Sequence, residues 1–160
     1  MKLLKTLKRT LPLLMVGICL SFTLITYGAE EEIIDGSRLT HDTTTTGEFQ
    51  TVIRGAILNS GRVTLTNKGG GTINCYGNTA CFKLCDKIEL EIYLERSSGS
   101  GWGSYTNWKY STSNDVSLSK SNTITVPGGY YYRLRGYHAC EKAGYSRESN
   151  SSYTNGIWIP

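Results

Sequence analysis

Apolar and polar residues alternate along much of this 160-residue chain, and the clearest case covers residues 87–95. Every second residue there is apolar, and glutamate or tyrosine lies between: Ile88, Leu90, Ile92 and Leu94 alternate with Glu89, Glu91, Tyr93 and Glu95. A period of two is typical of a strand that buries one face and exposes the other. The pattern therefore predicts a half-buried strand.

Further strands follow from the same alternation and from the turn residues between the runs. The clear runs are residues 62–66, 123–126 and 130–137, and weaker strands are expected over about 50–58, 72–76, 105–111 and 154–159. Turn residues such as Pro127-Gly128-Gly129 separate them. The pattern predicts an all-β antiparallel β-sandwich, immunoglobulin-like or similar, with about seven or eight short strands. A small β-barrel is the alternative, because periodicity does not separate the two folds.

The first 28 residues read as a cleaved signal peptide. Four basic residues (Lys2, Lys5, Lys8 and Arg9) precede an apolar run over residues 11–25, and small residues follow before Ala29. The run is shorter than the roughly 20 residues of a membrane-spanning helix. We expect a secreted protein with no membrane contact after cleavage, a flexible acidic and threonine-rich leader over residues 29–48, and a single domain over residues 49–160.

Removal of the signal changes the charge. The chain has a formal net charge of +4, and the signal carries four of the 17 Lys and Arg. The remaining 13 balance the 13 Asp and Glu, so the mature chain is formally neutral. Nucleic-acid affinity comes largely from neutralised phosphates, so a nucleic-acid partner is not expected.

Four cysteines follow the signal. An even number in an exported small domain indicates two disulfides, for which three connectivities exist. The alternation of strand faces favours Cys75–Cys140, with Cys81–Cys85 as a local link. A metal site that includes His138 is the alternative, but the cysteine spacing does not match paired zinc knuckles, so neither a metal nor another cofactor is expected.

No catalytic residue is predicted. His41 lies in the expected leader, and His138 has no G-x-S-x-G nucleophile motif to serve. Glutamates two apart on a strand lie roughly 6.5–7 Å apart, a separation that overlaps that of inverting glycosidases. Glu89, Glu91 and Glu95 are, however, typical of the solvated side of a strand.

Aromatic and arginine side chains are the remaining candidates for ligand contact. Tyr131, Arg133, Arg135 and Tyr137 alternate onto one face of a strand, which predicts that both arginines point to solvent. We expect Trp108 in the core and Trp102, between two glycines, in an exposed position. The candidate ligand-binding set comprises Trp102, Tyr105, Tyr131, Arg133, Arg135, Tyr137 and Trp158.

The last third of the chain carries its most recognisable runs, GYYYRLRGYH at residues 129–138 and TNGIWIP at residues 154–160. With the segments at residues 85–88 and 104–108, they resemble an uncharacterised family of small secreted proteins of Gram-positive bacteria, a domain of unknown function. The resemblance covers about residues 30–160. It implies a Gram-positive source and an all-β fold, and it brings no catalytic residues.

Together these observations favour a secreted, non-enzymatic binding module whose partner is a cell-envelope glycan, another carbohydrate or a surface protein. A small antagonistic effector, such as a bacteriocin-like toxin, is the alternative. A glycan-acting hydrolase, supported only by the acidic strand face, is the third.

Overall fold

The computed structural model describes residues 32–52 and 54–160, and the predicted signal peptide lies outside the described residues. Eleven strands are found in the described part: β1 (Ile33–Ile34), β2 (Ser37–Thr40), β3 (Thr44–Gln50), β4 (Leu58–Gly69), β5 (Thr72–Cys85), β6 (Lys87–Ser97), β7 (Gly103–Thr112), β8 (Asp115–Thr125), β9 (Tyr130–Glu141), β10 (Glu148–Tyr153) and β11 (Gly156–Ile159). No helix in this part of the chain is long and apolar enough to cross a membrane.

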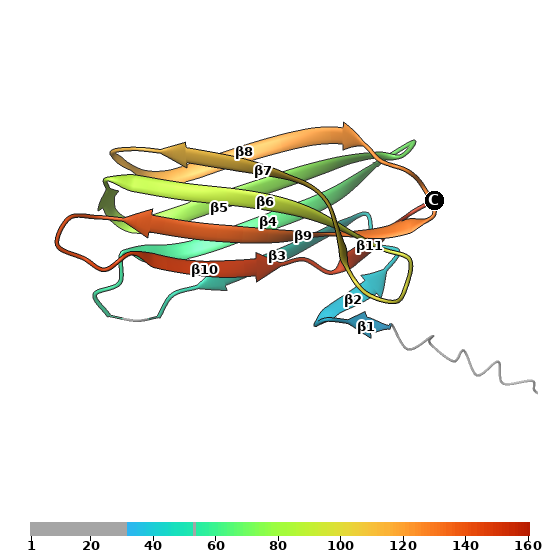
Figure 1. Cartoon of the computed structure of the whole chain (residues 1–160), viewed down its shortest axis with the longest axis horizontal. Coiled ribbons are helices and arrows are strands. Elements are labelled where there is room, and N and C mark those ends of the chain that lie inside the picture. Colours follow the sequence, from blue (N-terminus) through green and yellow to red (C-terminus); the bar gives the residue numbers. More distant parts are fainter. Residues whose placement is uncertain (1–31, 53) are drawn as a thin grey trace, which may run out of the picture.

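The strands form two sheets that lie face to face (Figure 1). The larger sheet has seven strands in the order β1-β2-β11-β9-β6-β7, with β10 paired to β9, and the smaller has the order β3-β4-β5-β8. All pairs are antiparallel except β11 with β2. The sheets do not close into a barrel, so the predicted β-sandwich is confirmed and the barrel alternative is wrong.

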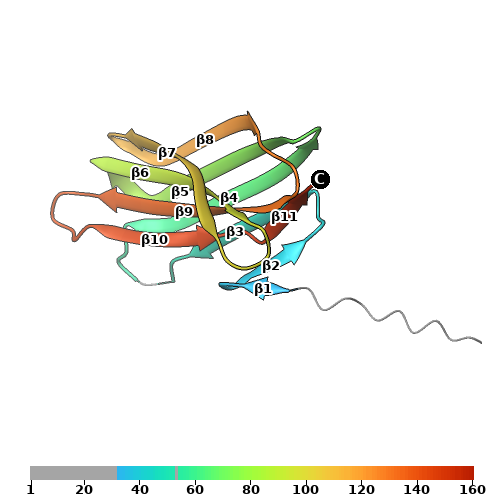
Figure 2. The same cartoon turned by 45° about the vertical axis from the view of Figure 1, so that its right-hand side comes forward.

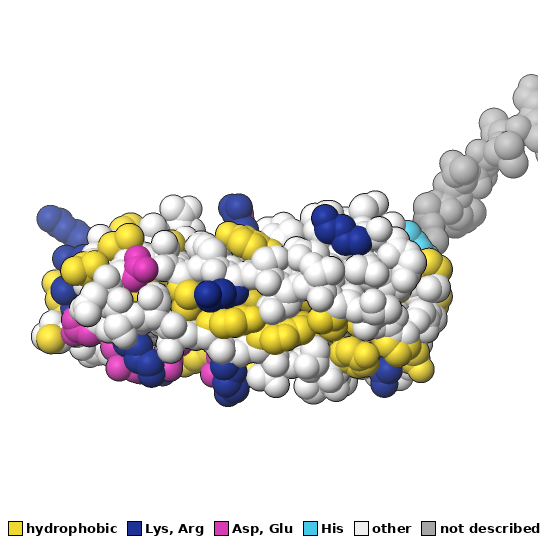
Figure 3. Space-filling model, turned by 90° about the horizontal axis from the view of Figure 1, so that it is seen from above, with side chains coloured by type: hydrophobic (Ala, Val, Ile, Leu, Met, Phe, Trp, Pro, Cys, Tyr) yellow, Lys and Arg dark blue, Asp and Glu magenta, His cyan; other side chains and the backbone are white. Residues whose placement is uncertain are grey.

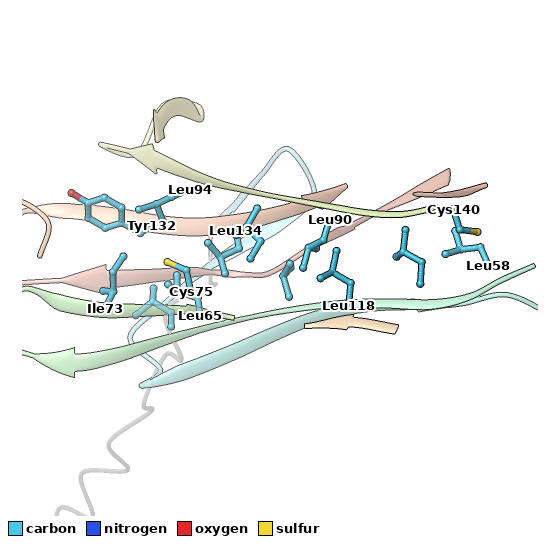
Figure 4. Close-up of a cluster of buried hydrophobic side chains, with 14 of the residues drawn as sticks. Leu58, Leu65, Ile73, Cys75, Leu90, Leu94, Leu118, Tyr132, Leu134 and Cys140 are labelled. Atoms are coloured by element: carbon cyan, nitrogen blue, oxygen red, sulfur yellow. The ribbon is translucent and has the colours of Figure 1, made fainter. Parts of the chain in front are cut away.

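The core is made by the inward faces of both sheets, as the alternation predicts. In β6, all four predicted inward residues are fully buried. Leu65, Ile73 and Cys75 meet them from the smaller sheet (Figure 4). Burying each such aliphatic side chain contributes about 1.5–3 kcal/mol to the free energy of folding. Packing of the two sheets against each other is therefore a main source of the stability of the fold.

The predicted boundaries were wrong at the N-terminal side. Residues 33–50, placed largely in a flexible leader, instead form β1, β2 and β3. Both views place β2 beside β11, with β1 on the outer side of β2 (Figures 1 and 2). Hydrogen bonds to the C-terminal segment support this position, including Ser37 Oγ to the Thr154 carbonyl at 2.9 Å. Long-range pairing thus orders a segment with little apolar content of its own.

The side of the sandwich at β7 and β8 exposes apolar side chains (Figure 3). Seen from this side, hydrophobic side chains form a band along the length of the molecule (Figure 3). Trp108, Tyr110 and Ile124 pack against the core while remaining half-buried, so Trp108, which was predicted to lie in the core, lies at its edge.

Candidate functional site

The outer face of the seven-stranded sheet carries most of the predicted ligand-binding residues. Tyr131, Arg133, Arg135 and Tyr137 share one face of β9 and alternate with inward residues, as predicted. Their rings and cations are largely engaged with one another or with neighbouring strands. The guanidinium of Arg135 lies 3.8 Å from the ring centre of Tyr93, and that of Arg147 lies 5.9 Å from the ring centre of Tyr137.

Arg133 corrects the prediction that both arginines point to solvent. The residue is only 5% exposed. Its guanidinium donates to Glu95 at 2.8 Å and to Ser37 Oγ at 3.0 Å, and it lies 4.5 Å from the ring centre of Trp102. The β1–β2 segment covers this end of the sheet, so Arg133 holds that segment in place.

Trp102 is likewise half-buried, where an exposed position was predicted. Its indole nitrogen donates to the carbonyl of Ile34 at 3.0 Å, which ties the β6–β7 connection to β1. Tyr105 packs its ring edge against Tyr132, and the Arg96 guanidinium lies 5.4 Å from its ring centre. These two aromatic side chains therefore have structural partners within the described residues.

A second aromatic group lies where β9, β11 and the end of β2 meet. The rings of Tyr131 and Trp158 are 5.0 Å apart, and His41 lies 6.1 Å from Tyr131. Tyr131 and Trp158 are half-buried and His41 is exposed. Of the predicted ligand-binding set, Tyr131 and Trp158 therefore form a partly exposed aromatic surface.

The glutamates of β6 are engaged in ion pairs, which weakens the hydrolase hypothesis. Glu89 pairs with Lys87 and Arg147, and hydrogen bonds from both lower its pKa. Burial raises the pKa of Glu91, but hydrogen bonds from Tyr93 and Lys109 outweigh it, so the net shift is downward. A glycosidase general acid needs a raised pKa, and neither carboxyl group has one.

Glu95 is also occupied. It receives hydrogen bonds from Arg133 at 2.8 Å and from Arg135 at 3.1 Å. The Glu95 carboxylate therefore holds both arginines in position, Arg133 over the Trp102 ring and Arg135 over the Tyr93 ring.

His138 is a core residue. It is fully buried, with Nδ1 2.9 Å from Thr79 Oγ1 and Nε2 2.9 Å from Ser152 Oγ. Burial lowers the pKa of His138 to about 4, so the ring is neutral at physiological pH. Ser152 and His138 resemble a catalytic Ser–His pair, but the imidazole ring is not exposed to solvent. Its hydrogen bond to Thr79 joins the two sheets.

The cysteines are arranged differently from the predicted disulfides. Cys75 and Cys140 lie well apart in the buried cluster and both are free, so the predicted Cys75–Cys140 bond is wrong (Figure 4). The sulfur atoms of Cys81, Cys85 and Cys140 instead lie within 4.8 Å of one another, and all three residues are buried. We call these three residues the thiol cluster. The sulfurs of Cys81 and Cys85 are close to each other but not bonded, so the Cys81–Cys85 link stays a prediction.

The outer face of the four-stranded sheet has a different chemistry that the sequence reasoning missed. Its side chains are almost all hydroxyls and amides, from Thr44 and Thr46 on β3, Thr64 and Thr66 on β4, Asn74 and Asn78 on β5, and Ser117, Ser119, Ser121 and Thr123 on β8. Cross-strand hydrogen bonds fix them, such as Asn78 Nδ2 to Ser119 Oγ at 2.7 Å. Each hydroxyl still has an unused donor or acceptor site for a ligand.

A hollow of about 610 Å³ opens on this face. Its walls come from β3, β4 and β5, and its lining includes Glu48, Gln50, Arg62, Tyr76 and Asn78. Glu48 and Arg62 form an exposed ion pair at 2.6 Å that neutralises both charges. The hollow therefore offers two aromatic residues, Phe49 and Tyr76, several amides and hydroxyls, and no net charge.

Two features of β4 shape the hollow. A register shift between Leu58 and Ser60 places Asn59 in a bulge at the rim, and its Oδ1 has no hydrogen-bond partner among the described residues. Gly61 lies over the rings of Phe49 and His138, where a Cβ atom would collide with both. The absence of a side chain at Gly61 leaves room for these two rings inside the sandwich.

Residues 27–156 match a protein family of unknown function, DUF6147. The chain belongs to this family. A search of curated proteins found no match.

Membership in the family agrees with the uncharacterised domain that the sequence resembles. The family description names no activity, ligand or partner.

Proposed function

We propose that the protein is a secreted, non-enzymatic binding module that holds a neutral glycan on the outer face of the four-stranded sheet. Secretion is supported by the signal-like residues 1–28, and a Gram-positive cell envelope as the source of the glycan by the resemblance of the C-terminal runs. The binding site is supported by the hollow lined by Tyr76 and Asn78.

The chemistry of the hollow matches a polyhydroxylated ligand. A sugar ring presents many hydroxyl groups and an apolar face. Tyr76 offers a flat ring, and Asn78, Gln50 and Ser60 offer donors and acceptors around it. The hydroxyl and amide rows of β5 and β8 continue this surface beyond the hollow, which suits a polymer longer than one sugar.

Charge argues for a neutral ligand and against hydrolysis. Glu48 and Arg62 are the charged residues of the lining, and they bind each other. A polyanion such as nucleic acid would need an excess of cations. Glycoside hydrolysis uses two carboxyl groups, and the lining offers only Glu48. The hollow is therefore suited to holding a glycan intact.

The experiment is co-sedimentation of the purified protein with insoluble peptidoglycan and with neutral cell-wall polysaccharide. We expect Tyr76→Ala and Asn78→Ala each to weaken binding by about tenfold or more. Tyr131→Ala is the matched control, because it removes a half-buried tyrosine from the opposite sheet. It should bind like the unaltered protein.

Loss of binding in Tyr131→Ala alone would move the site to the aromatic group of Tyr131 and Trp158. Absence of binding to both polymers by the unaltered protein would overturn the proposal, and growth inhibition of related bacteria would then favour the antagonistic effector.

A further inference from the structure

We infer that the thiol cluster is a three-thiolate site for one thiophilic metal ion, Zn(II) or Cu(I). Cys81 and Cys85 come from β5 and Cys140 from β9, so the site joins the two sheets at one end of the sandwich. This site is separate from the proposed glycan surface and does not depend on it.

The backbone of β5 departs from regular pairing to bring two of these sulfurs together. Ala80 pairs with Ser117 and Cys85 pairs with Asp115, so β5 advances five residues where β8 advances two. The surplus forms a bulge at residues 82–84, whose three side chains are exposed. In a regular strand, residues four apart are separated by roughly 13 Å. The bulge closes this separation to 4.8 Å or less between the two sulfurs.

The third sulfur is supplied by the opposite sheet. Cys140 pairs with Ile88 on β6 and with Glu148 on β10, in the regular inward position of β9. A metal bound to thiolates at about 2.3 Å needs its sulfur ligands roughly 4 Å apart. The cluster therefore needs only small side-chain movements to coordinate an ion.

Three converging thiols fit a metal better than a disulfide. A disulfide joins two sulfurs and would leave the third buried beside it, whereas one ion uses all three. On binding, each thiol releases its proton to solvent as its sulfur–metal bond forms.

The net charge of the occupied site depends on which ion it holds. Three thiolates around a divalent ion leave a net charge of −1, and around a monovalent ion −2, so charge favours Zn(II). Residues of both signs flank the cluster: Lys83 lies in the bulge and Lys142 donates to the Leu84 carbonyl at 2.8 Å, whereas Glu148 pairs with Cys140. A surface hollow of about 300 Å³ is lined by Phe82 and Lys83, two residues of the bulge that separates Cys81 from Cys85 in the chain.

The test is metal titration of the purified, fully reduced protein under anaerobic conditions, in separate Zn(II) and Cu(I) arms, with Cd(II) as the spectroscopic probe. We expect one ion per chain and a thiolate-to-cadmium absorption band of the intensity of three sulfurs. The band is read on the unaltered protein, so it does not depend on a variant that folds.

Serine variants assign the ligands. Cys81→Ser, Cys85→Ser and Cys140→Ser should each abolish stoichiometric binding. Cys75→Ser is the matched control, a buried cysteine of β5 outside the thiol cluster, and should bind normally. Circular dichroism of each variant shows whether it is folded.

Two results would overturn the inference. The first is failure of the reduced protein to bind any of the three ions at one per chain. The second is peptide mapping of protein isolated from its producing cells that finds a disulfide between two members of the thiol cluster. Retention of binding in any of the three serine variants would exclude that cysteine as a ligand and contradict the three-thiolate site.

Discussion

The two outer faces of this sandwich are built from different side chains, and the difference shows which face is available to a ligand. On the seven-stranded sheet, arginines, glutamates and tyrosines are interlocked, as where Glu95 binds both Arg133 and Arg135. On the four-stranded sheet, short hydroxyl and amide groups form a neutral surface with one ion pair, Glu48–Arg62. Arginine and tyrosine, which are common at binding interfaces, are engaged in internal contacts on the seven-stranded sheet. The outer face of the four-stranded sheet keeps free hydrogen-bonding groups.

The largest stability difference between the faces should come from their ion pairs. Arg133→Met is expected to cost about 3 kcal/mol of unfolding free energy, because it breaks a buried pair and releases the β1–β2 segment. Arg62→Ala on the other face should cost less than about 1 kcal/mol, because its pair is exposed. Urea unfolding measures both, and equal losses would remove the distinction.

As pH falls, protonation of His138, buried between the two sheets, should destabilise the protein before the glutamates on the outer face are protonated. The pKa of His138 falls from 6.5 to about 4 on folding, so protonation favours the unfolded state as pH drops below 6.5. Stability should fall by about 2 kcal/mol between pH 7.5 and 5. The lowered pKa values of Glu89 and Glu91 mean that these carboxylates lose their stabilising effect only below about pH 4.5.

Urea titrations at pH 7.5 and 5 measure this slope. His138→Gln should be less stable at both values but nearly independent of pH between them, while His41→Gln, at an exposed position, keeps the slope. An unchanged slope in His138→Gln would assign the acid sensitivity to another group.

The smallest effect concerns single contacts on the faces. A double-mutant cycle of Arg135→Ala and Tyr93→Ala should give a coupling of about 0.5–1 kcal/mol, since the guanidinium is stacked on the ring and partly exposed. The equivalent cycle of Thr46 and Thr64 should give about 0.2 kcal/mol. A larger coupling between the threonines would mean that the neutral face is as rigid as the charged one.

Much of the fold could be predicted from the sequence because its signal is local. Alternation in β6 and β9 gave the strands, their inward residues and the all-β sandwich. β10 was missed because its sequence, ESNSSY, has no aliphatic residue, and β1 and β2 because they are ordered by distant strands.

The candidate sites were harder because they depend on which strands become neighbours. The burial of Arg133 requires the cover of β1 and β2, and the thiol cluster requires a bulge that strand parity does not foresee. A local signal for the neutral face was nevertheless present: Ser117, Ser119, Ser121 and Thr123 alternate with the other residues of β8 at a period of two.

The most direct test of the account is mapping of the ligand surface by backbone amide chemical shifts. Soluble fragments of a cell-wall glycan would be titrated into isotopically labelled protein. We predict shifts on β3, β4 and β5 around Tyr76 and Asn78, with the amides of β9 and β11 unchanged. Shifts centred on Tyr131 and Trp158, or none at millimolar fragment, would contradict the claim that the neutral face is the binding surface.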